Sequence, residues 1–194
     1  MKKVSVFCGS STGTEPEFRK SAEELGKYLA VKKIEIIYGG AKVGLMGAVA
    51  DGALRNGGSV TGILPRFLNQ KEIAHEGLTS LIMVETMHER KLRMNELSEG
   101  VIALPGGYGT LEELFEMITW GQLGLHRKPV GILNINGFYD PLSVLLENMV
   151  INGFLKESNR RMLMTANNAA DLIKAMEQYS PPNETKWINF RESI

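Results

Sequence analysis

The residues with the clearest chemical potential lie in the segment LPGGYGTLEELFEM, residues 104–117. Three glycines and a threonine stand between an apolar run and a helix-like pattern. The first free N–H groups of such a helix, together with the hydroxyl group of Thr110, can hold one phosphate. A dinucleotide fingerprint is disfavoured because Glu112 stands where the third glycine belongs, and no loop has the Gly-Lys-Ser/Thr ending of an ATP-binding loop. The pattern predicts a monophosphate site, with a purely structural turn as the alternative.

Three carboxylates follow the glycine turn, at Glu112, Glu113 and Glu116. An acidic residue in a first helical turn commonly does no more than complement the positive end of the helix dipole, and that interpretation stays open for each of them. Three carboxylates near a bound phosphate would repel it unless one of them faces the reacting centre. A carboxylate beside a sugar carbon can stabilise an oxocarbenium-like charge or activate water.

A second charged motif, ETMHERKLRM, opens the preceding helix and should therefore reach the same edge of the fold. Arg90 and Lys91 lie near the start of that helix, where the dipole disfavours cations. We therefore expect an anionic partner, either Glu113 or a bound phosphate. The alternative is a solvated helix face on which Glu89 and Arg93 pair at i,i+4 spacing.

The remaining metal-ligating and nucleophilic side chains indicate no further chemistry. His75, His88 and His126 have no partners at metal-ligand spacing, so no metal site is predicted. Cys8 is the only cysteine and lies inside the apolar stretch VSVFCG, which favours core packing in a reduced protein over a reactive thiol.

Charge and hydropathy narrow the choice of partners. Among 194 residues, 22 basic side chains balance 22 acidic ones and no long run of one sign occurs, so neither nucleic acid nor a membrane is a predicted partner. We find no signal peptide and no run of about 18 uncharged apolar residues. The sequence predicts a soluble, cytoplasmic protein.

Apolar runs and helix-like patterns alternate along the whole chain. Six runs are predicted as strands, at residues 3–8, 34–38, 59–64, 79–84, 100–105 and 129–135. Helix-like stretches follow them, and a last helix is predicted over residues 169–179. Such alternation predicts an α/β fold with a Rossmann-like parallel sheet and helices on both faces.

The chain is predicted to form a single Rossmann-like nucleotide-binding domain over residues 1–194, with a polar C-terminal extension from about residue 180. Ligands of open parallel sheets bind beyond the carboxyl ends of the strands. Three glycine clusters follow predicted strands at such ends: Gly9, Gly39 with Gly40, and the glycines of the 104–117 segment. Their coincidence on one edge indicates a ligand site there.

Three of these stretches together carry a resemblance to a known family. MHERK (87–91), PGGYGTLEE (105–113) and the upstream YGGAKVGLMGAVADGA (38–53) closely resemble the Lonely Guy family of cytokinin riboside 5'-monophosphate phosphoribohydrolases, with its PGGxGTxxE motif. The resemblance covers nearly the whole chain. It implies a hydrolase that cleaves the N-glycosidic bond of a purine nucleoside 5'-monophosphate, adenosine or its N6-prenylated form, and releases free base and ribose 5-phosphate. It implies no cofactor and no metal.

The resemblance also assigns site residues and an assembly. Arg90 and Glu113 match the catalytic arginine and the last glutamate of the motif. Substrate-contacting positions match Glu72, Lys91, Gly107, Tyr108, Gly109, Thr110, Leu111, Glu112 and Thr119. Short family members are usually homodimers, to which the apolar stretch 117–125 could contribute.

Two other classes of function remain open at this stage. A nucleotide-sensing or carrier module of the same fold would keep the glycine turns without a catalytic pair. Members of the family are often labelled lysine decarboxylases, and decarboxylation of an amino acid is the weakest of the three hypotheses, because no lysine has the sequence context of a cofactor Schiff base.

Overall fold

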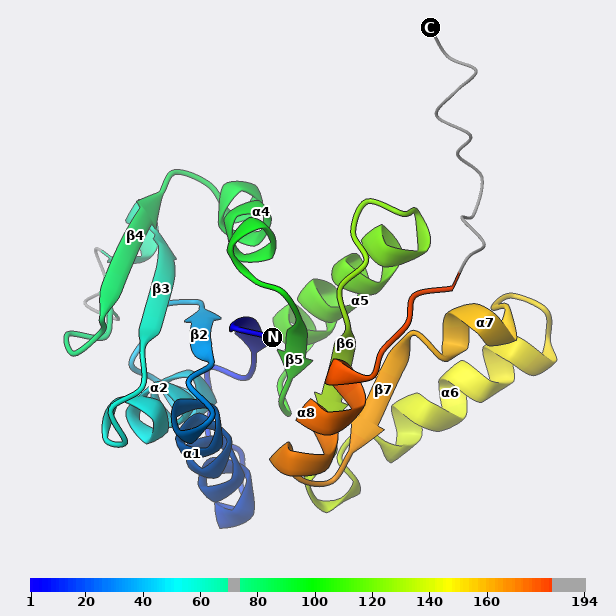
Figure 1. The fold of residues 1–194 in the computed structure, drawn as a ribbon, viewed down its shortest axis with the longest axis horizontal. Coiled ribbons are helices and arrows are strands. Elements are labelled where there is room, and N and C mark those ends of the chain that lie inside the picture. Colours follow the sequence, from blue (N-terminus) through cyan, green and yellow to red (C-terminus); the bar gives the residue numbers. More distant parts are fainter. Residues whose placement is uncertain (70–73, 183–194) are drawn as a thin grey trace, which may run out of the picture.

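The computed structural model describes residues 1–69 and 74–182, and these form a seven-stranded sheet in the order β4-β3-β2-β1-β5-β6-β7 (Figure 1). Every pair of neighbouring strands in it is parallel. The strands are β1 Lys3–Phe7, β2 Glu35–Tyr38, β3 Val60–Pro65, β4 Ser80–Val84, β5 Val101–Ala103, β6 Val130–Leu133 and β7 Leu163–Ala166.

The first strand of the chain lies in the middle of the sheet. Val6 of β1 is in register with Tyr38 of β2 on one side and with Ile102 of β5 on the other. The chain therefore builds the sheet outwards from β1 to β4, then returns to β1 and builds it outwards in the opposite direction. The point where the direction reverses, between β1 and β5, is where open α/β sheets form a ligand crevice.

Helices cover both faces of the sheet, each over its own apolar core. One face carries α1 Pro16–Val31, α2 Gly44–Leu54 and α8 Ala169–Glu177, and the other carries α4 Met87–Leu97, α5 Tyr108–Gln122 and α6 Asp140–Ile151. Along β1, Val4 and Val6 face the first core and Phe7 the second, as the two-residue period of a strand requires. Shorter helical segments are α3 Arg66–Asn69, η1 Ile135–Gly137 and α7 Glu157–Arg160.

The predicted fold class is confirmed, and each of the six predicted strands is present within one or two residues of its expected bounds. The last helix and the buried position of Cys8 are also confirmed. The edge strand β7 was missed. Only Leu163 of its four residues is fully buried, so the strand lacks the continuous apolar run that marks the others.

Most of the predicted polar extension lies outside the described residues, which end at residue 182. Within the ranges that the structure describes, no helix is both long and apolar enough to cross a membrane.

Candidate active site

The glycine turn lies at the predicted place, between the end of β5 and the start of α5. Gly107 is the N-cap residue of α5 and provides no capping side chain, so the first N–H groups of the helix are left for another partner. The turn is fixed beside β1 by a hydrogen bond from the N–H of Gly9 to the carbonyl of Pro105, at 3.0 Å. The structure thus places the uncapped N-terminus of α5 beside the end of β1.

The glycines of this turn differ in what the fold requires of them. A Cβ atom at Gly106 would overlap the buried side chain of Thr110, so Gly106 is needed for packing. A Cβ at Gly107 or Gly109 would meet no atom within 4 Å. Protein packing therefore gives no reason for glycine at the latter two positions, whereas close approach of a ligand to the backbone does.

Arg90 and Glu113 meet above the ends of the central strands. Arg90 extends from the first turn of α4 and Glu113 from the second turn of α5, and the closest nitrogen and oxygen are 3.7 Å apart. Their side chains are only 11% and 10% exposed. The Nε atom of Arg90 is buried and donates to no group of the described chain.

Gly39 makes room for this arginine. A Cβ atom at position 39 would overlap the guanidinium group of Arg90, so this glycine at the end of β2 serves the packing of a site side chain. The Gly39–Gly40 cluster was predicted as part of the ligand edge, and the structure gives its first member a more specific role.

The charge state of Glu113 is set mainly by its surroundings. Burial raises the pKa of Glu113 because it disfavours the ionised form, and the adjacent Arg90 only partly offsets this effect. The negative charge of Glu112 raises the pKa further. A buried carboxyl group whose pKa is shifted by burial and by a specific charged partner is a candidate active-site residue.

Lys91 binds the other two acidic residues of α5. Its ammonium group lies 2.5 Å from Glu112 and 3.0 Å from Glu116, and the lysine side chain is 12% exposed. Although burial alone would favour the neutral amine, the hydrogen bonds to these carboxylates raise the pKa of Lys91. The expected anionic partners of the α4 cations are therefore present, and each carboxylate that follows the glycine turn has a cation beside it.

The alternative pairing on α4 is wrong. Arg93 pairs with Glu96 at 2.9 Å, while Glu89 accepts a hydrogen bond from the backbone N–H of Glu85 at 2.8 Å. The hydroxyl of Thr86 caps the helix by accepting from the N–H of Glu89. These contacts fix the start of α4 and, with it, the position of Arg90.

The other predicted substrate residues are distributed unevenly. Tyr108 is 94% exposed at the start of α5, and Leu111 is half-buried one turn later. Thr119 lies 12 residues beyond Gly107, ~18 Å along the helix at a rise of about 1.5 Å per residue. It lines a separate groove of about 190 Å³ between α5 and α6, so the structure does not bring it to the turn. Glu72 lies outside the described residues.

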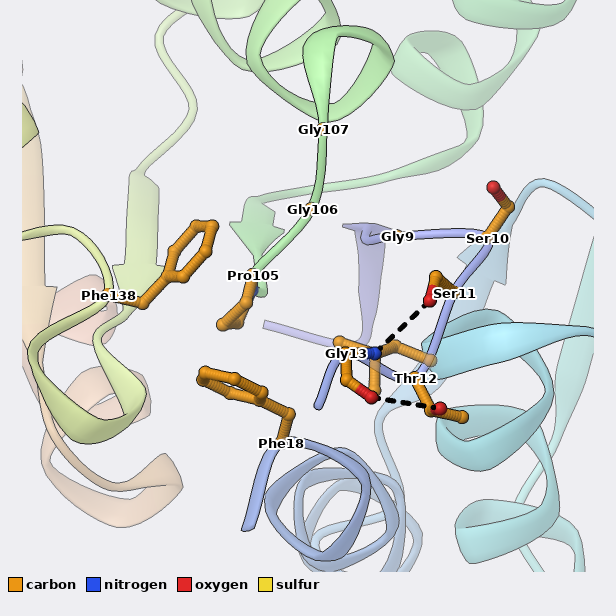
Figure 2. A pocket seen from close by; sticks show the side chains of 11 residues that line it. Gly9, Ser10, Ser11, Thr12, Gly13, Phe18, Pro105, Gly106, Gly107 and Phe138 are labelled. Atoms are coloured by element: carbon orange, nitrogen blue, oxygen red, sulfur yellow. Dashed lines mark hydrogen bonds between the residues drawn. The ribbon is translucent and has the colours of Figure 1, made fainter. Parts of the chain in front are cut away.

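Sequence reasoning missed a pocket that adjoins the turn (Figure 2). It has a volume of about 300 Å³ and is lined by Gly9, Ser10, Ser11, Thr12, Gly13, Phe18, Leu45, Pro105, Gly106, Gly107 and Phe138. Neither Arg90 nor Glu113 lines it. The run Gly-Ser-Ser-Thr-Gly after β1 was the available signal, but its two aromatic walls come from distant segments.

Two of the three histidines, His75 and His126, have structural partners. His75 lies 3.2 Å from Asp51, and His126 contacts the carbonyl of Met117 at 2.8 Å. In the part of the chain that the structure describes, no three His, Cys, Asp or Glu side chains are grouped to hold a metal ion.

A parallel sheet with helices on both faces and a glycine turn at its switch point defines a Rossmann-like α/β protein. The family model described as "possible lysine decarboxylase" matches residues 46–176, more than half of the chain. The cytokinin riboside 5'-monophosphate phosphoribohydrolases LOG7 and LOG5 of Arabidopsis thaliana are 44% and 46% identical over 180 and 183 residues. These alignments cover 93% and 94% of this chain, and 83% and 80% of the relatives. The chain belongs to this family, the Lonely Guy (LOG) family.

Solved structures show the same fold at lower identity. A molybdenum cofactor carrier protein from Chlamydomonas reinhardtii has a TM-score of 0.70 at 20% identity, and a molybdenum cofactor binding protein from Rippkaea orientalis has 0.69 at 22%. Each alignment covers 91% of this chain and 96% of the solved one. At this identity the likeness concerns the fold alone.

Proposed function

We propose that this protein is a hydrolase that cleaves the N-glycosidic bond of purine nucleoside 5'-monophosphates, namely AMP or its N6-prenylated forms. The observation that carries the proposal is the buried Arg90–Glu113 pair beside the open helix terminus at Gly107. The names of the relatives, cytokinin riboside 5'-monophosphate phosphoribohydrolases, support the same reaction. The products would be the free base and ribose 5-phosphate.

The reaction needs opposite charges to be stabilised on its two fragments. Water forms a bond to the anomeric carbon, the carbon–nitrogen bond breaks with its electron pair passing to the purine, and the purine takes up the proton that the water loses. The ribose becomes positive on the way, and the Glu113 carboxylate can offset that charge or orient the water. Arg90 favours the ionised form of Glu113, and its Nε atom, which has no partner in the described chain, could donate to the phosphate or the departing base.

The proposal is tested by incubating the purified protein with AMP and with N6-prenylated AMP. We expect free base and ribose 5-phosphate in equal amounts, measured by chromatography. The ratio of the two kcat/KM values identifies the preferred substrate. Binding of both nucleotides in calorimetry without release of base would contradict the proposal and favour a non-catalytic nucleotide-binding module.

We also propose a homodimer in which the exposed apolar face of α6 takes part. Val144 and Ile151, two helical turns apart, are 61% and 79% exposed, and Phe154 just beyond the helix is 83% exposed. Apolar side chains that cluster on a surface commonly mark an interface. From the predicted stretch 117–125, Leu125 is exposed, while Trp120 packs against the core. The proposal is tested by analytical ultracentrifugation of wild type and Ile151→Glu. Wild type should sediment as a dimer and the variant as a monomer, because the introduced charge would be buried in the interface.

A further inference from the structure

The pocket beside the glycine turn has walls that suit a planar apolar group. The rings of Phe18 and Phe138 stand edge to face, with centroids 5.8 Å apart and an angle of 80° between them. Pro105 continues this apolar lining (Figure 2). Leu45 also lines the pocket. Edge-to-face aromatic pairs provide well-defined contact surfaces for a third ring, and a volume of about 300 Å³ holds one.

Phe138 is held at the pocket by a rigid loop although its own side chain is 42% exposed. The next residue, Tyr139, is buried and donates a hydrogen bond to the carbonyl of Leu104 at 2.7 Å, and its N–H donates to Asn134 at 2.8 Å. Within the same loop Asn136 has φ +50, a left-handed conformation that costs free energy for a residue other than glycine. The Phe138 ring packs edge to face against Phe18 and Tyr139, and the same ring forms part of the pocket wall.

The opposite wall is the loop between β1 and α1. Gly13 has φ +74, and a Cβ atom there would lie 2.7 Å from the Phe18 ring, so glycine lets the loop lie against that ring. The Gly13 N–H donates to the hydroxyl of Ser11 at 3.3 Å, and Ser10 and Thr12 add polar groups to the rim. The pocket therefore combines apolar walls with a polar entrance next to the phosphate-binding turn.

The order of the strands places this pocket and the catalytic pair on opposite sides of the turn. Arg90 lies against Gly39 at the end of β2, whereas Phe138 follows β6. Strands β1 and β5, which carry the Gly9 loop and the glycine turn, lie between them. A phosphate on the turn would have its ribose on the side of Arg90 and a remaining oxygen directed to the pocket.

We propose that this pocket binds a planar aromatic group that is esterified to the 5'-phosphate of the nucleotide. The inference rests on the proposed function for the position of the phosphate and ribose. It extends the substrate class from nucleoside 5'-monophosphates to nucleoside 5'-phosphodiesters with a ring on the second alcohol. The ring would lie in the pocket against the walls formed by Phe18 and Phe138, with the phosphodiester at Gly106 and Gly107.

The test compares two phosphodiesters of equal charge, the methyl and the phenyl ester of AMP, in calorimetry with the full-length protein. The phenyl ester should bind about tenfold more tightly than the methyl ester, because only its ring reaches the apolar walls. In Phe138→Ala this ratio of dissociation constants should fall at least threefold. Val31→Ala is the control, because Val31 is 68% exposed at the C-terminal end of α1 and does not line this pocket.

A ratio near one in wild type would overturn the inference, as would a Phe138→Ala variant that weakens both esters equally. Phe138→Leu keeps apolar volume and should give an intermediate ratio, so a folding defect of the alanine variant does not decide the test. If the protein releases base from AMP but binds the methyl and phenyl esters equally, the proposed function stands and the inference fails. If the phenyl ester binds more tightly than the methyl ester but AMP releases no base, the pocket binds the ring and the proposed hydrolysis fails.

Discussion

Replacing Glu113 by glutamine tests whether this carboxylate takes part in the reaction. The side chains of Arg90 and Glu113 are about nine-tenths buried, so their charges are screened much less than in water. At an effective dielectric constant of about 20, a full positive charge about 4 Å from the carboxylate is stabilised by about 4 kcal/mol. The ribose develops only part of a charge and Arg90 opposes it, which leaves about 2.7 kcal/mol, a factor of about 100 in kcat.

The assay is single-turnover release of adenine from AMP, with enzyme in excess over substrate. Glutamine keeps the shape of the side chain, so we expect AMP affinity to stay within several-fold while the rate falls by a factor of about 100 or more. The matched control is Glu35→Gln, which removes a carboxylate paired with Lys3 at 2.9 Å at the start of β2. If folded Glu113→Gln releases adenine at the wild-type rate, the Glu113 carboxylate has no catalytic role. It would then only stabilise the N-terminal end of α5.

The same variant separates the roles of Arg90. If the guanidinium acts only through Glu113, Arg90→Ala should cost little more once Glu113 is already glutamine. If it also contacts the phosphate, a substantial part of its effect should persist in the double variant and appear in KM. A full double-mutant cycle in kcat and KM distinguishes these results.

Three further outcomes follow from the site. Adenosine should react at least tens of times more slowly than AMP, because charge-assisted bonds at the α5 terminus contribute about 1.5–3 kcal/mol each; equal rates would remove the phosphate site. Gly109→Val should fold, since a Cβ there meets no atom within 4 Å, yet lose AMP binding in calorimetry; unchanged affinity would make the glycine structural. Because the folded-state pKa of Glu113 is raised, its contribution to stability is lost as the pH rises through that value. Glu113→Gln should therefore gain stability over wild type in denaturant titrations at pH 8, and the difference should shrink towards pH 4. A constant difference at both pH values would contradict the raised pKa.

The architecture could be predicted because its signals are local. Buried parallel strands require nearly continuous apolar runs, and glycines after them mark the turns at the carboxyl edge. The pairing of Arg90 with Glu113 could also be predicted. Two cations at the start of a helix need an anionic partner, and a carboxylate-rich helix start was expected on the same edge of the sheet. The half-exposed strand β7 lacked such a signal.

The rest of the site depends on contacts between distant segments. Gly39 precedes Arg90 by about fifty positions, and only the folded chain shows that the glycine is needed for the arginine to fit. The pocket walls Phe18 and Phe138 come from opposite halves of the sequence. Thr119 illustrates the reverse case, because a residue matched by resemblance lies on the right helix yet far from the turn.

The central position of β1 also determines when the site can form. During synthesis, strands β1 to β4 can pair in sequence order, but the other edge of β1 stays unpaired until β5 has been made, since Ser5 lies beside Val101. An open central edge is the part of an unfinished sheet most prone to pairing with another chain. The closing of that edge by β5 also brings Glu113 to Arg90. Catalytic competence and protection from misassembly would therefore arise in the same folding step.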